Sequence, residues 1–345
     1  MASTRQLWDE SYLEGPEATG LRRRHARWVV ATALAGMATF GSDYRAAAEP
    51  VTLSRAIYWD LPDRNTDAAR DISKLLSLGI SEVHIFVNEP PPEPDDVAKQ
   101  GLLFSYTNSD LPHGLPRWTV ATLSEFVKAL QAAKLKVVFT LSPQHRFEAY
   151  IADLSAPGKP LGLARQIGGI DIELDVEENW REDLAPKFCG PANWQDMPKR
   201  LADEIRDIRA PADQRKPLKL IVSRHPAFLQ LADVIAPQLY EKYFGHSPEM
   251  IRDELSSKWF LKGRVFQPAL TVFCRPGDHA TVCSQDIFDK SVKAVARLAK
   301  CDGRGKVITG LAIWSWKTIK ENSVFGDAYL LDATKRTVDV SCAHP

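Results

Sequence analysis

Four carboxylic acids alternate with aliphatic residues at the end of the segment GGIDIELDVE, residues 168–177. They are Asp171, Glu173, Asp175 and Glu177. Because side chains of a β-strand point to opposite faces in turn, the pattern predicts a strand with four carboxylates on its inner face. Like charges a few ångströms apart disfavour joint ionisation, so we expect at least one acid to keep its proton near neutral pH. A carboxyl group with a raised pKa suits general-acid cleavage of a glycosidic bond.

The same alternation has a structural interpretation, a ladder of buried salt bridges to arginines or lysines from other strands. The predicted strands carry few inward basic residues, and those considered, Arg55, Lys219 and Arg264, lie only at strand starts. Clustered carboxylates without obvious counter-ions favour a functional site over a purely structural ladder.

Two further predicted strands end in polar and aromatic residues. The segment QLYE covers residues 238–241, and the Tyr240 hydroxyl there can donate to a substrate carbonyl. The segment GLAIWSW covers residues 310–316, and the Trp314 indole can form a floor under a sugar ring. Each alone is explained as well by core packing, but the three strand ends together favour a site. The candidate substrate-binding residues are Trp59, Asp60, Glu89, Asp171, Gln238, Glu241, Trp314 and Trp316.

An alternation of strand-like and helix-like segments must position these side chains. Predicted strands cover 55–61, 82–88, 136–141, 170–176, 218–223, 234–239, 265–272 and 307–314. Predicted helices cover 66–78, 122–134, 197–208, 248–259 and 285–300, and Gly79 is expected to end the first of them. Eight strands mostly separated by helices predict an α/β fold with parallel pairing, a closed (β/α)8 TIM barrel. A doubly wound open sheet is the rival, but no phosphate-binding glycine loop follows an early strand.

In this order, the motifs resemble glycoside hydrolase family 18, especially the hevamine-like chitinases. That family carries an acidic ladder, D-G-x-D-x-D-x-E, on its fourth strand, Q-x-Y or M-x-Y on its sixth, and a glycine followed after three residues by tryptophan on its eighth. Residues 169–177, 238–240 and 310–314 are similar to these, and KVVFTLS at 136–142 looks like the third strand. The likeness extends over nearly all of the chain after residue 48.

The acidic ladder fits the family pattern in two registers. One starts at Gly169-Ile170-Asp171 and places Glu173 and Asp175 where the family has an Asp and the catalytic Glu. The other aligns the final acid and places Glu173, Asp175 and Glu177 on the ladder; we prefer it because it keeps a Glu at the exit of the strand. The segment LDVE, residues 174–177, also resembles the D-x-E of family 25 lysozymes.

The resemblance implies an exported retaining glycoside hydrolase that acts beside an N-acetyl sugar in a chitin-like polymer, peptidoglycan or an exopolysaccharide. Glu177 would protonate the leaving oxygen, and Asp175 would orient a substrate acetamido group acting as nucleophile. Tyr240 would hold the acetamido carbonyl, Trp314 would stack under the sugar, and Glu173 completes the catalytic set. No cofactor is required. The alternative is a catalytically inactive chitinase-like protein that binds carbohydrate.

Composition narrows the class of partner. The chain has 44 basic and 44 acidic residues, a balance that disfavours binding to nucleic acid or steering toward anionic membranes. Its eight histidines lack metal-ligand spacing and no C-x-x-C is present, so no metal site is expected. We expect a polysaccharide or oligosaccharide partner, no nucleic acid, no stable membrane insertion, and a monomer.

The first 48 residues have the three parts of a signal peptide. A polar stretch with a basic cluster at 22–27 precedes the apolar run Trp28 to Phe40, and Ala46-Ala47-Ala48 supplies small residues for cleavage. The apolar run is shorter than the roughly 20 residues that span a bilayer. We expect export by the Sec or twin-arginine route to the periplasm or beyond, and one barrel domain over 49–345. An amphipathic helix packed on the domain is the alternative.

Export would permit disulfide bonds among the five cysteines. Cys274 and Cys283 flank a turn-rich segment and are the favoured pair. Cys301 bonded to Cys342 would hold the C-terminal tail, which leaves Cys189 unpaired.

Overall fold

The structure is a computed structural model, and it describes the chain in separate ranges. These are 49–59, 67–87, 120–141, 160–176, 196–207, 220–222, 226–239, 265–271, 285–301, 307–314, 316, 319 and 337–340. Several predictions fall on residues outside these ranges: the signal peptide, the helix over 248–259, the pair Cys274 and Cys283, and the candidate site residues Asp60, Glu89, Glu177, Tyr240 and Glu241.

Short parallel strands form the centre of the molecule. They are β2 (Ser54–Trp59), β3 (Glu82–Phe86), β4 (Lys136–Leu141), β5 (Ile170–Leu174), β6 (Leu220–Val222), β7 (Val234–Ile235), β8 (Val265–Phe266), β9 (Ala269–Thr271), β10 (Val307–Ile308) and β11 (Gly310–Trp314). Hydrogen bonding connects them in the order β10-β8-β7-β6-β5-β4-β3-β2-β11-β9.

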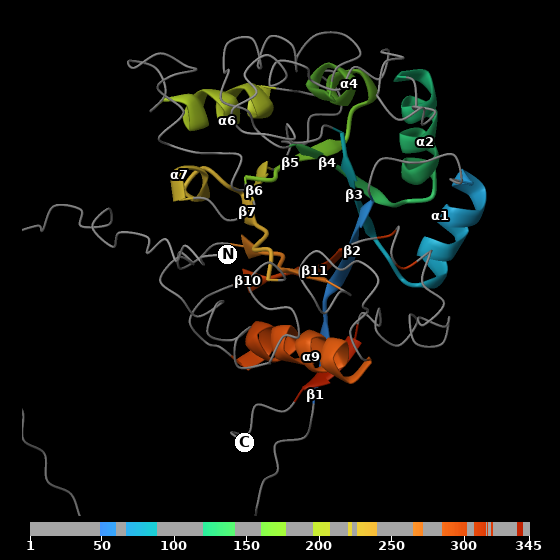
Figure 1. Ribbon diagram of the computed structural model, residues 1–345, viewed down its shortest axis with the longest axis vertical. Helices are drawn as coiled ribbons and strands as arrows, with labels where there is room; N and C mark the ends of the chain where they lie inside the picture. Colours follow the sequence, from blue (N-terminus) through green and yellow to red (C-terminus); the bar gives the residue numbers. More distant parts are fainter. Residues whose placement is uncertain are drawn as a thin grey trace, which may run out of the picture. The chain divides into compact units, whose positions relative to one another are not determined.

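This order closes into a barrel. The predicted strand over 265–272 is interrupted at Gln267-Pro268, where proline has no N–H for the ladder, and is divided into β8 and β9. The predicted strand over 307–314 is interrupted at Thr309 and divided into β10 and β11. Because β8 pairs with β10 and β9 pairs with β11, the two ends of the order meet. The described strands therefore form the predicted (β/α)8 fold (Figure 1).

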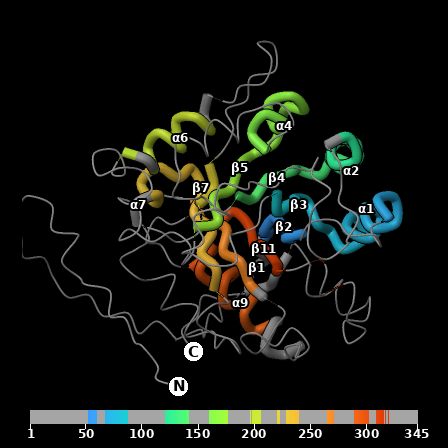
Figure 2. Tube along the Cα trace, turned by 45° about the horizontal axis from the view of Figure 1, so that its top comes forward, coloured from blue at the N-terminus to red at the C-terminus, as the bar shows by residue number. Residues whose placement is uncertain are grey.

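Helices surround the ring of strands in both views (Figures 1 and 2). They are α1 (Ala68–Ser77), α2 (Val120–Ala132), α4 (Pro160–Ile167), α6 (Met197–Asp207), α7 (Pro226–Leu229) and α9 (Gln285–Cys301). Helix α1 begins where the Asp67 side chain accepts a hydrogen bond from the Arg70 N–H at 3.0 Å. It ends before Gly79, whose φ of 72° confirms the predicted glycine terminator. Helices α4 and α7 were not predicted.

Alternation along the strands separates two environments. Outward residues such as Ile57, Val83 and Ile172 belong to the large apolar core between strands and helices. Two smaller apolar clusters fill parts of the barrel interior. One contains Ala56, Tyr58, Ala269 and Ala312 with Phe86 and Trp314; the other contains Val138, Ile221, Val234 and Ala236 with Val265. Polar side chains occupy the interior space beside these clusters.

A second sheet joins the two ends of the described chain. Strand β1 (Glu49–Thr52) pairs antiparallel with β12 (Thr337–Val340), and both strands contact α9. Cys301, the last residue of α9, is disulfide-bonded to a residue outside the described ranges. Its pairing with Cys342 stays a prediction. Among the described residues, no helix has the length and apolar character needed to cross a bilayer.

Candidate functional site

The acidic residues of β5 point into the barrel, as their alternation predicts. Ile170, Ile172 and Leu174 lie in the outer core, whereas Asp171, Glu173 and Asp175 contact polar groups of other strands. A strand rises about 3.3 Å per residue, so successive inward carboxylates are about 6.6 Å apart along the barrel. The three carboxylates therefore lie at different depths in the barrel, and each has its own neighbours. Their mutual repulsion is weaker than the sequence alone suggests.

Glu173 lies at the centre of a buried hydrogen-bond network and is 1% exposed. Its Oε1 accepts from the Tyr58 hydroxyl at 2.6 Å, and its Oε2 accepts from the Thr140 hydroxyl at 2.8 Å. The Nδ1 atom of His84 lies 2.8 Å from the same Oε2. Three strands thus supply donors to one carboxylate. Glu173 was predicted to be catalytic, and the structure encloses its carboxylate among these three side chains.

His84 connects Glu173 to a second carboxylate. It is completely buried, and its Nε2 lies 2.6 Å from Oε1 of Glu82. Both ring nitrogens face carboxylate oxygens, so a ring that is protonated at both nitrogens can donate to both. Burial alone would lower the pKa of His84, but the charges and hydrogen bonds of Glu173 and Glu82 outweigh it and raise that pKa to about 9.

Glu82 is held by donors from three directions. Besides His84, it accepts from Lys136 Nζ at 2.6 Å and from Gln267 Nε2 at 2.9 Å. Burial would raise the pKa of the Glu82 carboxyl, but His84 and Lys136 together keep it well below its usual range. Lys136 Nζ also lies 2.9 Å from Oδ2 of Asp171. Burial would lower the pKa of Lys136, and the two carboxylates raise it instead.

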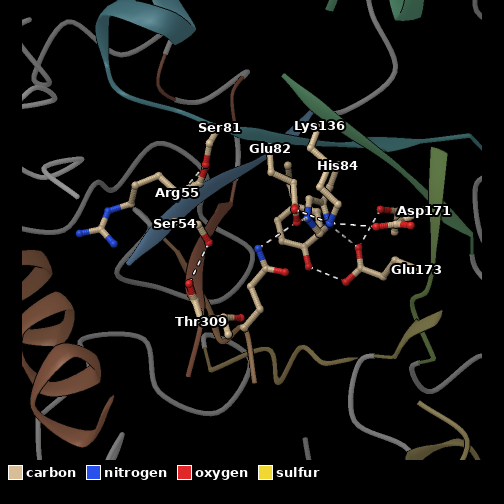
Figure 3. A network of polar contacts seen from close by, with 12 residues as sticks. Ser54, Arg55, Ser81, Glu82, His84, Lys136, Asp171, Glu173 and Thr309 are labelled. Atoms are coloured by element: carbon tan, nitrogen blue, oxygen red, sulfur yellow. Dashed lines mark hydrogen bonds and ion pairs between the residues drawn. The ribbon is translucent and has the colours of Figure 1, made fainter. Parts of the chain in front are cut away.

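The ionisable groups of the interior form one chain of alternating sign, drawn in Figure 3. Its members in order are Asp171, Lys136, Glu82, His84 and Glu173. Asp171, predicted to bind substrate, is instead the ion-pair partner of Lys136 at the start of the strands. Four residues of strand separate it from Asp175 by about 13 Å along the barrel.

The counter-ions that sequence analysis did not find are His84 and Lys136. Lys136 is the first residue of β4 and faces inward, whereas Arg55, which was considered, extends away from the network (Figure 3). The Arg55 Nη1 lies 3.5 Å from the Leu53 carbonyl oxygen. The segment EVHIF in β3 alternates as clearly as the acidic strand does, and this was the available signal for Glu82 and His84.

At the C-terminal end of the strands, the structure brings two predicted residues together. Asp175 directly follows β5 and is 7% exposed. Gln238, which follows β7 and makes an isolated bridge to Ala269, donates from Nε2 to Oδ1 of Asp175. In (β/α)8 enzymes, this end of the strands carries the catalytic residues.

Trp314 faces the barrel interior at the end of β11 and is partly exposed. Its ring centroid lies 5.5 Å from that of Tyr58 and 5.1 Å from that of Phe86, the latter edge-to-face. Phe86 is partly exposed too and was not predicted. Two adjoining aromatic rings in the interior can contact the apolar face of a sugar.

Two other predicted aromatic contacts prove to be core residues. Trp59 packs edge-to-face on Phe126 of α2 with centroids 4.9 Å apart, and Trp316 lies 5.8 Å from Trp59. Both tryptophans are buried in the outer core. Trp59 follows Tyr58 directly, so alternation that turns the tyrosine inward turns this indole toward the helices.

The opposite end of the barrel contains a cavity of about 330 Å³. Its lining includes Ser54, Glu82, Lys136 and Gln267, together with two valines, near the starts of their strands. This end of a (β/α)8 barrel is generally associated with stability rather than catalysis. Within the described ranges, no group of three or more His, Cys, Asp or Glu side chains is arranged to hold a metal ion.

No protein-family model and no curated protein matches this chain in sequence. Similar solved structures include α-L-fucosidase isoenzyme 1 from Paenibacillus thiaminolyticus, at 12% identity over 81% of this chain and 72% of that one, with a TM-score of 0.46. The maltogenic α-amylase AmyB from Thermotoga neapolitana is 12% identical over 81% and 75% of the two chains, with a TM-score of 0.47. A chitinase from Rhizomucor miehei is 10% identical over 81% and 98%, with a TM-score of 0.46. Likenesses this distant carry no inference about activity, and the barrel rests on its own strand pairing.

Proposed function

We propose that this chain is an exported glycoside hydrolase that cleaves an amino-sugar polysaccharide at the C-terminal end of its barrel. The observation that carries the proposal is the hydrogen bond between Gln238 and Asp175, which joins the ends of two strands above the buried Glu173 network. Trp314, at the end of a third strand, contacts the same network through Tyr58. A carboxylate, an amide and an indole at one end of a barrel are groups that bind and cleave sugars.

The proposed mechanism is retaining and substrate-assisted. Glu177, two residues beyond Asp175, gives its proton to the glycosidic oxygen as the bond from that oxygen to the anomeric carbon breaks. The carbonyl oxygen of the substrate acetamido group attacks the anomeric carbon and forms a cyclic oxazolinium ion. Glu177, now a carboxylate, then takes a proton from water as the water opens that ring, so the original configuration is restored.

The remaining groups orient the substrate. Asp175 accepts from Gln238 and presents its carboxylate to the acetamido N–H, which strengthens the nucleophile. Tyr240, two residues beyond Gln238, donates to the acetamido oxygen. The partly exposed rings of Trp314 and Phe86 lie under the sugar.

A polymer panel tests the activity and separates it from binding alone. Chitin oligomers, peptidoglycan and an N-acetylated exopolysaccharide are incubated with the full chain, and new reducing ends are measured, with chemically de-N-acetylated polymer as the paired substrate. Cleavage of the acetylated polymer only, with retained configuration in the product by NMR, is expected. Binding without new reducing ends would identify a carbohydrate-binding barrel instead.

A matched pair of variants assigns the activity to the site. Glu177→Gln removes the proton donor with little change in shape, and its cleavage rate should fall roughly 10²–10⁴-fold. Glu204→Gln makes the same chemical change on α6, where Glu204 bonds to Arg165, and should keep the full rate. Full activity in both Glu177→Gln and Asp175→Asn would refute the mechanism.

A further inference from the structure

We propose that His84 is a positioning residue of the candidate site, an imidazolium that holds Glu173 ionised and in one orientation beneath the reacting groups. The inference rests on the proposed function for its effect on catalysis, but its structural part can be measured without any substrate. His84 does not touch a substrate in this scheme and acts only through Glu173.

The geometry of the ring carries the inference. His84 is completely buried, and its two nitrogens lie 2.8 Å and 2.6 Å from oxygens of Glu173 and Glu82. A neutral imidazole has one N–H and can donate to one carboxylate only. A ring protonated on both nitrogens donates to both carboxylates at once, and this is the state that we infer for His84. The ring of Tyr58 packs on His84 with centroids 4.8 Å apart and restricts its rotation.

The groups around His84 explain why the charge persists there. On its own strand it faces Glu82, and from β5 it faces Glu173. From β2 and β4, Tyr58 and Thr140 donate to Glu173 rather than to the ring. Beyond these groups, Lys136 contacts Glu82, and Asp171 contacts Lys136. The pKa of His84, raised to about 9, agrees with this arrangement.

The charge on His84 limits which carboxyl group can supply the proton for cleavage. With His84 charged, Glu173 accepts three hydrogen bonds and has no role as a proton donor. The carboxylate then serves as a fixed negative charge one step below Asp175 on the same face of β5. The proton used in cleavage must come from a carboxyl group nearer the exit of the strand.

The test removes the positive charge of His84 by substitution and observes the carboxyl group of Glu173 directly. In His84→Gln, the positive charge next to the buried Glu173 carboxylate is lost, and the ¹³C signal of that carboxyl group should differ at pH 7.5 from its position in the unmodified chain. The side-chain carboxyl carbons are observed by ¹³C NMR in the full chain, with the Glu173 signal assigned from Glu173→Gln. Histidine ¹⁵N NMR of the unmodified chain should show both ring nitrogens of His84 protonated at pH 7.5.

The pH dependence of the cleavage rate distinguishes a positioning role of His84 from a merely structural one. If the positive charge of His84 is needed for cleavage, the acidic limb of the pH–rate profile moves to higher pH in His84→Gln by more than one pH unit. Tyr58→Phe is the matched control, since it removes a neutral donor from the same carboxylate and should lower the rate without moving that limb by as much as one pH unit.

Each outcome decides the question. A neutral His84 ring at pH 7.5, an unchanged Glu173 carboxyl signal in His84→Gln, or an unshifted pH–rate profile in an active His84→Gln enzyme overturns the proposal. If the unmodified chain cleaves no polymer, the proposed function fails, while the two NMR measurements still decide the role of His84. Should His84→Gln not fold, the variant His84→Gln with Glu82→Gln removes one charge of each sign and also leaves Glu173 without its counter-ion.

Discussion

Stability should fall with rising pH through the titration of His84. The pKa of this ring is raised from 6.5 to about 9 in the folded chain. A raised folded pKa means that protons bind the folded state more tightly, so this stabilisation is complete below pH 6.5 and is lost as pH rises through 9. A rise of about 2.5 units at about 1.36 kcal/mol each corresponds to about 3 kcal/mol. Because His84 is completely buried, solvent does not screen this contribution.

Urea denaturation followed by tryptophan fluorescence measures the effect. The free energy of unfolding is determined at pH values from 6 to 9.5 for the unmodified chain and for His84→Gln. Other groups titrate in this window, so the difference between the two pH slopes isolates His84. The unmodified chain should lose about 3 kcal/mol more than the variant, a large part of the 5–15 kcal/mol typical of a domain. Equal slopes in the two proteins would refute the assignment of an imidazolium.

Three further predictions concern other parts of the barrel. Lys136→Met removes the cation that the carboxylates of Glu82 and Asp171 share, and it should lower the free energy of unfolding by about 1–2 kcal/mol, a value reduced for the partial exposure of the lysine; urea denaturation at pH 7 measures it. Gly310→Ala would bring a Cβ 2.1 Å from the Ser54 Oγ and should lower the free energy of unfolding by about 1–3 kcal/mol. Thermal unfolding should show part of this loss recovered in the double variant with Ser54→Ala. Trp314→Ala should weaken binding of chitin oligomers at least tenfold in calorimetry while leaving the unfolding transition cooperative; unchanged affinity would exclude Trp314 from the binding surface.

Local periodicity was sufficient to predict most of the barrel. Strands with dense alternation, such as 136–141, were predicted with the bounds that the structure has. The pairing of β1 with β12 was not predicted, because it joins segments from opposite ends of the chain and leaves no local signal. The divisions at Pro268 and Thr309 depend on how neighbouring strands meet when the barrel closes, which no single segment reveals.

The candidate site was predictable only as far as the strand face. Alternation correctly placed Asp171, Glu173 and Asp175 on the inside, but their partners depend on the register between strands. Glu173 pairs in register with Thr140 on β4, and Lys136 pairs with Glu82 on β3. These registers place hydrogen-bond donors beside acids that we had expected, from the sequence, to repel one another. The alternative that was kept open, a ladder of buried ion pairs with arginines or lysines, is what the structure has for Asp171, which pairs with Lys136, whereas Glu173 pairs with a histidine.

The division of roles along the acidic strand follows from this difference in surroundings. Glu173 is enclosed by three donors, so it is suited to supply a fixed negative charge. Asp175 lies one step nearer the exit, and its Oδ1 accepts from the amide nitrogen of Gln238, an atom that can only donate; any proton on Asp175 would have to be on the other oxygen. That geometry suits a carboxylate that orients a substrate N–H better than it suits an acid that must release a proton repeatedly. The proton donor is then best sought at Glu177, the next acid on the same face by sequence, which favours the register that ends the ladder there.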